Sequence, residues 1–219
     1  SALARVVDVL EAEPVGRGDA PVGDASAEPS VRVSDLAVGW PGSGAVASGI
    51  SFQLVAGRSV AVVGPSGVGK TTLAATVLGL IPPVSGEVVT AGRIGYLAQD
   101  AHLFATTVAE NVRIGNKDAT DEEVLAALAG AGLTMDPERV VGELGATLSG
   151  GEARRLALSR LLAGSYDVLV LDEPSEHLDA PTANALLDDL WAGVGTRPLL
   201  VVTHDESVVA RCDEVVRLG

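Results

Sequence analysis

The sequence predicts an α/β fold with a helical block inserted between its two halves. Short apolar runs typical of strands alternate with helical patterns near both ends of the chain, and this alternation indicates a sheet covered by helices. From about Phe104 to Gly164 the pattern becomes mainly helical. A glycine-rich loop at residues 64–71 joins one apolar run to the helical pattern that follows it. We therefore expect a strand, a tight loop and a helix at that point.

The expected strands are short, apolar and bounded by turn residues. They span Val31–Val38, Ile50–Val55, Ser59–Val63, Gly86–Val89, Arg93–Leu97, Val168–Leu171, Leu199–Val202 and Glu214–Arg217. The expected helices span Thr71–Leu80, Val124–Ala129, Ala153–Ala163 and Ala183–Trp191. Two of these helices follow a capping-box pattern, at Thr120–Glu123 and at Ser149–Glu152. Pro181 sits where the last helix would begin.

The first 30 residues differ in composition from the rest. Apolar residues at helical spacing predict a short helix over Leu3–Leu10, and residues 14–30 are rich in Gly, Pro, Ala and Asp, as in a linker. A frayed terminus is the simpler interpretation of this helix. We expect residues 31–219 to form the folded domain, with its helical subdomain at about 104–164.

Composition excludes several classes of protein. The formal net charge of −14 argues against binding to nucleic acid or to anionic lipid, because both require a basic face. Cys212 is the only cysteine, so no disulfide can form within the chain. No apolar run approaches the ~20 residues that span a bilayer, and we expect no signal peptide in this sequence. We expect the chain by itself to be soluble.

The glycine-rich loop matches G-x-x-x-x-G-K-[ST], the pattern of a loop that binds phosphates through its backbone N–H groups. In this pattern Lys70 reaches the β- and γ-phosphates, and the hydroxyl of Thr71 binds Mg²⁺. A glycine-rich turn that matches by chance is the alternative. The candidate ATP ligands are Gly64, Pro65, Ser66, Gly67, Val68, Gly69, Lys70, Thr71 and Thr72.

Two acidic residues follow the apolar strand Val168–Leu171. A strand that is apolar throughout is buried on both faces of a parallel sheet, and its carboxyl end opens where ligands bind. Asp172 is therefore a candidate ligand of Mg²⁺, and Glu173 a candidate to polarise the attacking water. An ordinary turn would explain two such acids alone, but not their combination with the phosphate loop.

A third motif, Leu148-Ser149-Gly150-Gly151-Glu152, lies between the other two. In this order the three motifs resemble those of the ATPase domain of ABC transporters, from about Val31 to Gly219. The resemblance implies a phosphate-loop core with an antiparallel β subdomain and an inserted α-helical subdomain. It also implies that Ser149, Gly150, Gly151 and Glu152 bind the γ-phosphate of ATP held by an opposite subunit. The family more often has Gln where this chain has Glu152.

The same resemblance assigns roles to four further residues. Gln99 matches a catalytic glutamine that senses Mg²⁺ and the membrane domain, and His204 matches a catalytic histidine that contacts the γ-phosphate. Asp179 matches an aspartate that contributes to the nucleotide site from the loop after Asp172 and Glu173, and Trp40 matches the aromatic residue that stacks on adenine. The alternatives are an ordinary surface histidine and a core tryptophan. Lys70 and Glu173 complete the expected catalytic set.

Two segments, 103–112 and 141–145, resemble exporter-type members of the family. The span from Gly86 to Gln99 is shorter than in most exporters, and Glu173-Pro174-Ser175-Glu176-His177-Leu178-Asp179 departs from the usual exporter motif. Both features resemble the C subunit of the heterodimeric cysteine and glutathione exporter that supports cytochrome bd assembly. In exporters, a connector similar to residues 1–30 leads from an upstream membrane domain.

The resemblance thus implies an ATP- and Mg²⁺-dependent motor domain at the cytoplasmic face of the inner (cell) membrane, within an integral membrane transporter. Its expected partners are a transmembrane domain upstream and a second ATPase domain, in a homodimer or more plausibly a heterodimer. Three alternatives remain open: a soluble ABC ATPase without a transport role, a regulatory module that binds nucleotide without hydrolysis, and a small-molecule kinase.

Overall fold

The computed structural model describes residues 28–142 and 145–219. The expected helix over Leu3–Leu10 and the linker up to residue 27 lie outside the described residues. Two residues of the segment 141–145 also lie outside them. Within the described ranges, no helix is both long enough and apolar enough to cross a membrane.

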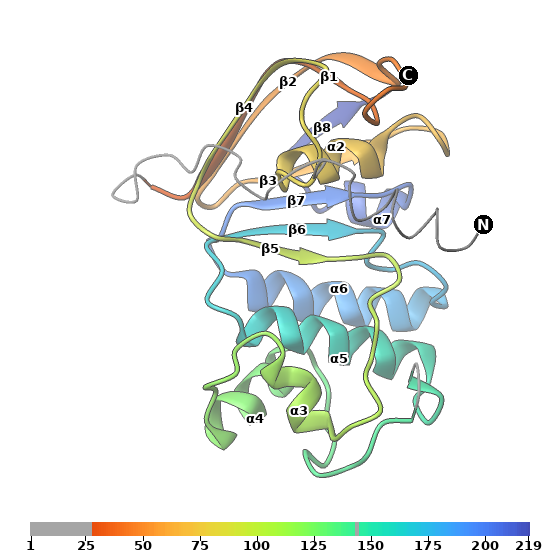
Figure 1. The fold of residues 1–219 in the computed structure, drawn as a ribbon. Helices are drawn as coiled ribbons and strands as arrows, with labels where there is room; N and C mark the ends of the chain where they lie inside the picture. Colours follow the sequence, from red (N-terminus) through yellow and green to blue (C-terminus); the bar gives the residue numbers. More distant parts are fainter. Residues whose placement is uncertain (1–27, 143–144) are drawn as a thin grey trace, which may run out of the picture.

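A five-stranded parallel sheet forms the centre of the molecule (Figure 1). Its order is β5-β6-β7-β3-β8, and all neighbouring strands run parallel. The strands are β3 (Ser59–Val63), β5 (Ile94–Leu97), β6 (Val168–Asp172), β7 (Leu199–Val202) and β8 (Glu214–Arg217). Every residue of β3, β6 and β7 is buried, as expected for strands covered on both faces.

Alternate side chains of β6 and β7 enter two different hydrophobic clusters. On β6, Leu169 and Leu171 join one cluster, whereas Val168 and Val170 join the other. Helix α2 (Lys70–Val77) supplies residues to the second cluster, and helices α5 (Gly150–Ala163) and α6 (Ala180–Val194) supply the first. The sheet therefore separates two cores, with α2 on one face and α5 and α6 on the other (Figure 1).

Three further helices lie within the described ranges. Helices α3 (Val108–Arg113) and α4 (Asp121–Gly130) pack beside α5, on the side of the molecule away from α2 (Figure 1). Helix α7 (Glu206–Val209) follows β7. Both predicted capping boxes are confirmed, at the first residues of α4 and of α5.

A second sheet lies beside α2 and is antiparallel, with the order β2-β1-β4. Its strands are β1 (Ser30–Val38), β2 (Ala47–Val55) and β4 (Ser85–Ala91). The parallel sheet, the antiparallel sheet and the covering helices confirm the predicted fold class. They also place the loop between β3 and α2 close to the antiparallel sheet.

The element bounds differ from expectation at a few points. Strand β2 begins at Ala47 rather than Ile50, because its pairing with β1 continues to the pair Val38 and Ala47. Helix α2 ends at Val77 rather than Leu80, because Gly79 takes a φ of +71° and ends the helix as a C-terminal glycine does. The sequence analysis missed α7.

Truncation of one side chain of β6 tests the assigned burial of this strand. Leu169 is fully buried, so we expect Leu169→Ala to lower the free energy of unfolding by about 2–5 kcal/mol. Leu125 on α4 is 53% exposed, and Leu125→Ala is the matched control, with an expected change within about 0.5 kcal/mol. Urea unfolding measures both variants. Equal losses in the two would contradict the assigned burial.

Candidate active site

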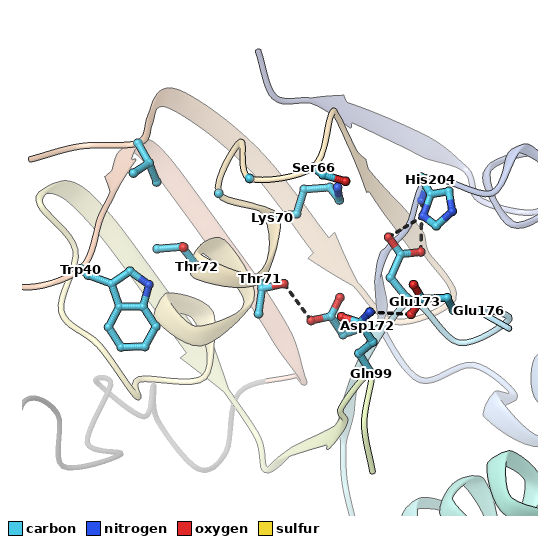
Figure 2. A pocket seen from close by; sticks show the side chains of 13 residues that line it. Trp40, Ser66, Lys70, Thr71, Thr72, Gln99, Asp172, Glu173, Glu176 and His204 are labelled. Atoms are coloured by element: carbon cyan, nitrogen blue, oxygen red, sulfur yellow. Dashed lines mark hydrogen bonds and ion pairs between the residues drawn. The ribbon is translucent and has the colours of Figure 1, made fainter. Parts of the chain in front are cut away.

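A cavity of about 420 Å³ opens at the carboxyl ends of β3, β5, β6 and β7 (Figure 2). It brings together residues from the phosphate loop, from the two acids after β6 and from the segments that follow β5 and β7. The lining residues are Trp40, Val46, Ser66, Gly67, Gly69, Lys70, Thr71, Thr72, Gln99, Asp172, Glu173, Glu176 and His204. Most of the sequence-predicted site therefore gathers around one hollow.

The phosphate loop is shaped by glycines. Gly67 and Gly69 have φ angles of +79° and +106°, in the region where a side chain is unfavourable. No side chain caps the first turn of α2, and no acidic residue lies in that turn. The N–H groups of Lys70, Thr71 and Thr72 therefore remain free of side-chain caps at the positive end of the helix dipole, which favours an anion.

Lys70 is held by the loop itself. Its Nζ donates to the carbonyl oxygens of Gly64 at 2.9 Å and Pro65 at 3.3 Å. Both partners are neutral, and Lys70 forms no salt bridge with any of the described residues, so its charge is available at the cavity wall (Figure 2). A phosphate that enters the loop can therefore gain a charge-assisted hydrogen bond from Lys70.

Asp172 is 1% exposed and has one satisfied carboxylate oxygen. Its Oδ2 accepts hydrogen bonds from the Thr71 hydroxyl at 3.1 Å and the Tyr96 hydroxyl at 3.3 Å. Its Oδ1 is buried and has no hydrogen-bond partner among the described residues. Burial raises the pKa of the Asp172 carboxyl, and it raises the pKa of Tyr96 to about 12.

These facts fit a cation beside Asp172. A buried oxygen without a partner costs free energy unless a ligand satisfies it. Carboxylate and hydroxyl oxygens are the ligands that Mg²⁺ prefers. Thr71 and Asp172 are therefore well placed to hold Mg²⁺ between the loop and the end of β6.

Glu173 and His204 form a pair at the opposite end of the cavity from Trp40 (Figure 2). The Oε1 of Glu173 lies 2.9 Å from the Nδ1 of His204, and its Oε2 accepts from the His204 backbone N–H at 3.2 Å. Glu173 has a φ of +47°, a strained value for a non-glycine residue that is often found at functional sites. The hydrogen bond and the charge of Glu173 raise the pKa of His204.

Gln99 meets a residue that the sequence analysis did not select. Its Nε2 donates to the Oε2 of Glu176 at 2.5 Å, and both residues line the cavity. Gln99 therefore contacts Glu176 rather than Asp172 in this structure (Figure 2). The sequence analysis noted that the motif containing Glu176 departs from the usual exporter pattern, but it assigned Glu176 no role in the site.

Trp40 lines the cavity beside Thr72 and is 56% exposed. It is therefore not a core aromatic, which was the alternative to its predicted role. An exposed indole at the rim can offer its face to a planar ring. Contact with adenine stays a prediction.

The remaining predicted residues do not line this cavity. Ser149, Gly150, Gly151 and Glu152 form the start of α5, where Ser149 and Glu152 cap each other through hydrogen bonds of 3.2 and 2.8 Å. The Ser149 backbone N–H holds the pKa of Glu152 below its ordinary value. Asp179 caps α6 by accepting from the N–H of Thr182.

Sequence reasoning also missed Tyr96 and Arg154. Tyr96 contacts Asp172, as described above, from the strand next to β6. Arg154 lies on α5 and donates to backbone carbonyls beneath the cavity, including that of Asp172 at 3.1 Å. An arginine on a helix ordinarily indicates a solvated surface, so no signal in the sequence marked it.

Comparison with known proteins supports the class that the site defines, a phosphate-loop nucleotide-binding ATPase. The family model described as "ABC transporter" matches residues 47–176. The mycobactin import ATP-binding/permease protein IrtB of Mycobacterium tuberculosis is 32% identical over 98% of this chain and 41% of its own. The type I secretion system ATP-binding protein PrsD of Rhizobium meliloti is 35% identical over 98% of this chain and 40% of its own.

A solved structure agrees with these relatives. The structure of a bacterial Atm1-family ABC exporter with ATP bound has a TM-score of 0.83 and 29% sequence identity, and the match covers all of this chain and 42% of that one. This chain belongs to the ABC transporter family, in which it is an ATP-binding and ATP-hydrolysing domain of exporter type. It spans about two-fifths of the length of these relatives.

Removal of the Glu173 charge tests the acid–histidine pair. The carboxylate stabilises the protonated imidazole, so the pair contributes fully to stability below the ordinary His pKa of 6.5 and loses this contribution as pH rises through the raised pKa. We expect Glu173→Gln to move the pKa of His204 back down toward its ordinary value. NMR titration of the histidine ring protons measures the shift, and Glu122→Gln, at an exposed site on α4, is the control. An unchanged His204 pKa would contradict the pairing.

Proposed function

We propose that this chain is the Mg²⁺-dependent motor domain of an exporter-type ABC transporter, and that it drives transport by hydrolysing ATP with the residues of the cavity described above. The observation that carries this proposal is the buried Asp172, which lines the same cavity as Lys70 and the start of α2 and whose Oδ1 has no hydrogen-bond partner within the part of the chain that the structure describes. A phosphate loop opposite a cation site is the arrangement that phosphoryl transfer requires.

Each cavity residue then has a role. The loop N–H groups and Lys70 bind the β- and γ-phosphates. Thr71 and Asp172 would hold Mg²⁺, and Gln99 would become a further ligand of Mg²⁺ once its contact with Glu176 is released. Bound Mg²⁺ would neutralise charge that develops on the phosphate oxygens. Trp40 stacks on adenine at the other end of the cavity.

The two remaining residues act on the attacking water. Glu173 accepts a hydrogen bond from this water and polarises it. His204 fixes the direction of the Glu173 carboxylate through the 2.9 Å contact and offers its other ring nitrogen to the γ-phosphate. Catalysis therefore comes mainly from positioning and electrostatics.

A second ATPase domain completes the site. Ser149, Gly150 and Gly151 begin α5, in the layer on the opposite face of the parallel sheet from α2 (Figure 1). They do not line the cavity of their own chain. We therefore propose that two such domains pair head to tail, each presenting this segment to the nucleotide of the other, in a homodimer or a heterodimer.

The transported substrate is the finer part of the proposal. Relatives named for mycobactin import and for type I secretion differ in cargo, so the ATPase domain alone does not select it. The short span from Gly86 to Gln99 and the Glu176-His177 motif resemble one subgroup of exporters, and on this resemblance, rather than on any contact with cargo, we propose a thiol exporter for cysteine or glutathione. In that case a membrane domain precedes residue 1, and the ATPase domain lies at the cytoplasmic face of the cell membrane.

Glu173→Gln tests the catalytic assignment. The amide cannot accept a proton as the carboxylate does, so we expect turnover to fall by at least about 10²-fold while ATP affinity is retained. Phosphate release and isothermal titration calorimetry measure the two quantities, and Glu122→Gln serves as the matched control. Hydrolysis by Glu173→Gln at the wild-type rate would contradict the role of Glu173. A wild-type chain that binds ATP without hydrolysis would favour a regulatory module instead.

Dilution tests the shared site. The net charge of −14 opposes self-association at low salt, so we expect the dimer to dissociate on dilution. If only the dimer is active, specific activity should rise with protein concentration. Ser149→Arg should abolish turnover and leave the ATP affinity of the monomer unchanged. Ser165→Arg adds the same charge beyond the far end of α5 and should have no effect. Light scattering measures mass along the series, and constant specific activity where only monomer is present would overturn the dimer model.

A further inference from the structure

Arg154 is a buried cation that forms no salt bridge with a carboxylate among residues 28–142 and 145–219. The residue is 9% exposed and projects from the second turn of α5. Its Nε donates to the carbonyl oxygen of Pro174 at 3.0 Å. Its Nη1 donates to the carbonyls of Ala98, at 3.1 Å, and Gln99. Its Nη2 donates to the carbonyls of Asp172, at 3.1 Å, and Glu173.

These contacts use the full hydrogen-bonding capacity of the side chain. A guanidinium has five N–H donors in a planar fork, and five backbone carbonyls accept from this one. Two of these carbonyls follow β5, and the other three are consecutive at the end of β6. One side chain of α5 therefore connects the chain segments that carry Gln99 and Glu173.

The geometry of Glu173 explains why such a connection matters. Its φ of +47° is unfavourable for a residue with a side chain, and such strain persists only where neighbours hold the backbone in place. The Glu173 N–H donates to the carbonyl of Val202 at 2.8 Å, and its own carbonyl accepts from Arg154. The peptide groups on both sides of its Cα are thus anchored, and this orients the Cα–Cβ bond from which the carboxylate reaches His204.

On the premise that Glu173 acts on the attacking water, as proposed above, we propose that Arg154 is a positioning residue for ATP hydrolysis. It holds the backbones of Gln99 and Glu173 in register with each other and joins them to α5. Because α5 begins with the segment Ser149–Glu152, a displacement of this segment by a second subunit is transmitted to both catalytic side chains. Arg154 itself does not line the nucleotide cavity.

Arg155 provides a matched control within the same helix. Its side chain is 13% exposed, and its Nη1 contacts Asp189 on α6 and the carbonyl of Ala131 at 2.7 Å. These partners lie in the helical part of the molecule and do not line the nucleotide cavity. Substitution of Arg155 therefore removes an arginine that is almost as buried as Arg154, without touching the residues around the cavity.

The experiment compares Arg154→Lys and Arg154→Met with Arg155→Lys and Arg155→Met. Lysine keeps the charge but cannot bond both strand ends, because its three donors lie on a single nitrogen. We expect Arg154→Lys to keep ATP affinity within about threefold and to lower kcat by about 10–10²-fold, as small misplacements of catalytic groups do. Arg154→Met should lower kcat further. The Arg155 variants should keep the wild-type kcat even if urea unfolding shows that they are less stable.

A second readout does not depend on hydrolysis. The pKa of His204 reports whether the Glu173 carboxylate still faces it, and NMR titration should show that this pKa falls in Arg154→Lys and not in Arg155→Lys. An unchanged His204 pKa together with an unchanged kcat in folded Arg154→Lys would overturn the proposal. Equal losses of kcat in the Arg154 and Arg155 variants would also overturn it, because the effect would then follow stability alone.

A double variant separates this proposal from the proposed function. If Arg154 acts through Glu173, Arg154→Lys should reduce turnover little further in a Glu173→Gln background, since residues that act as a unit are not additive. Full additivity would contradict a positioning role through Glu173. If Glu173→Gln turns over like the wild type, the catalytic assignment fails, while the His204 titration still tests whether Arg154 orients Glu173.

Discussion

The burial of two acidic residues at the end of β6 is the constraint on which the site depends. A strand apolar on both faces carries Asp172 and Glu173 to the edge of a water-poor sheet, where a carboxylate without partners is costly. The surrounding elements each supply a compensating contact. Hydroxyls from α2 and β5 reach Asp172, His204 faces Glu173, and Arg154 binds the carbonyls beneath both.

The topology of the sheet explains why these contacts meet. In a parallel sheet all carboxyl ends lie at one edge, so the loops after β3, β5, β6 and β7 converge although they are far apart in sequence. The same topology places α5 on the face opposite α2 (Figure 1). The start of α5 is thus separated from the nucleotide cavity of its own chain, yet linked to it through Arg154. This arrangement suits a site that a second domain completes and controls.

The sequence was informative wherever a local pattern decides the structure. Strands β3 and β8 have the predicted bounds, both capping boxes formed as predicted, and the phosphate loop and the two acids line one cavity. The sequence was uninformative where a contact depends on tertiary packing. The partners of Arg154 are backbone carbonyls, which any residue type could supply, and the contact between Glu176 and Gln99 joins two loops. The early end of α2 depended on the backbone conformation of Gly79.

Magnesium dependence of nucleotide binding tests the central claim, that the buried Asp172 is a cation ligand. Thermal unfolding of the wild type and of Asp172→Asn is measured with ATP and Mg²⁺, and with ATP and EDTA. A ligand that binds the folded state raises Tm, and at a fixed ligand concentration the rise is larger when the affinity is higher. The wild type should gain an additional rise in Tm from Mg²⁺. Asp172→Asn should fold, keep the rise caused by ATP in EDTA and lose the additional rise from Mg²⁺. A magnesium-dependent rise of the same size in both proteins would contradict the claim.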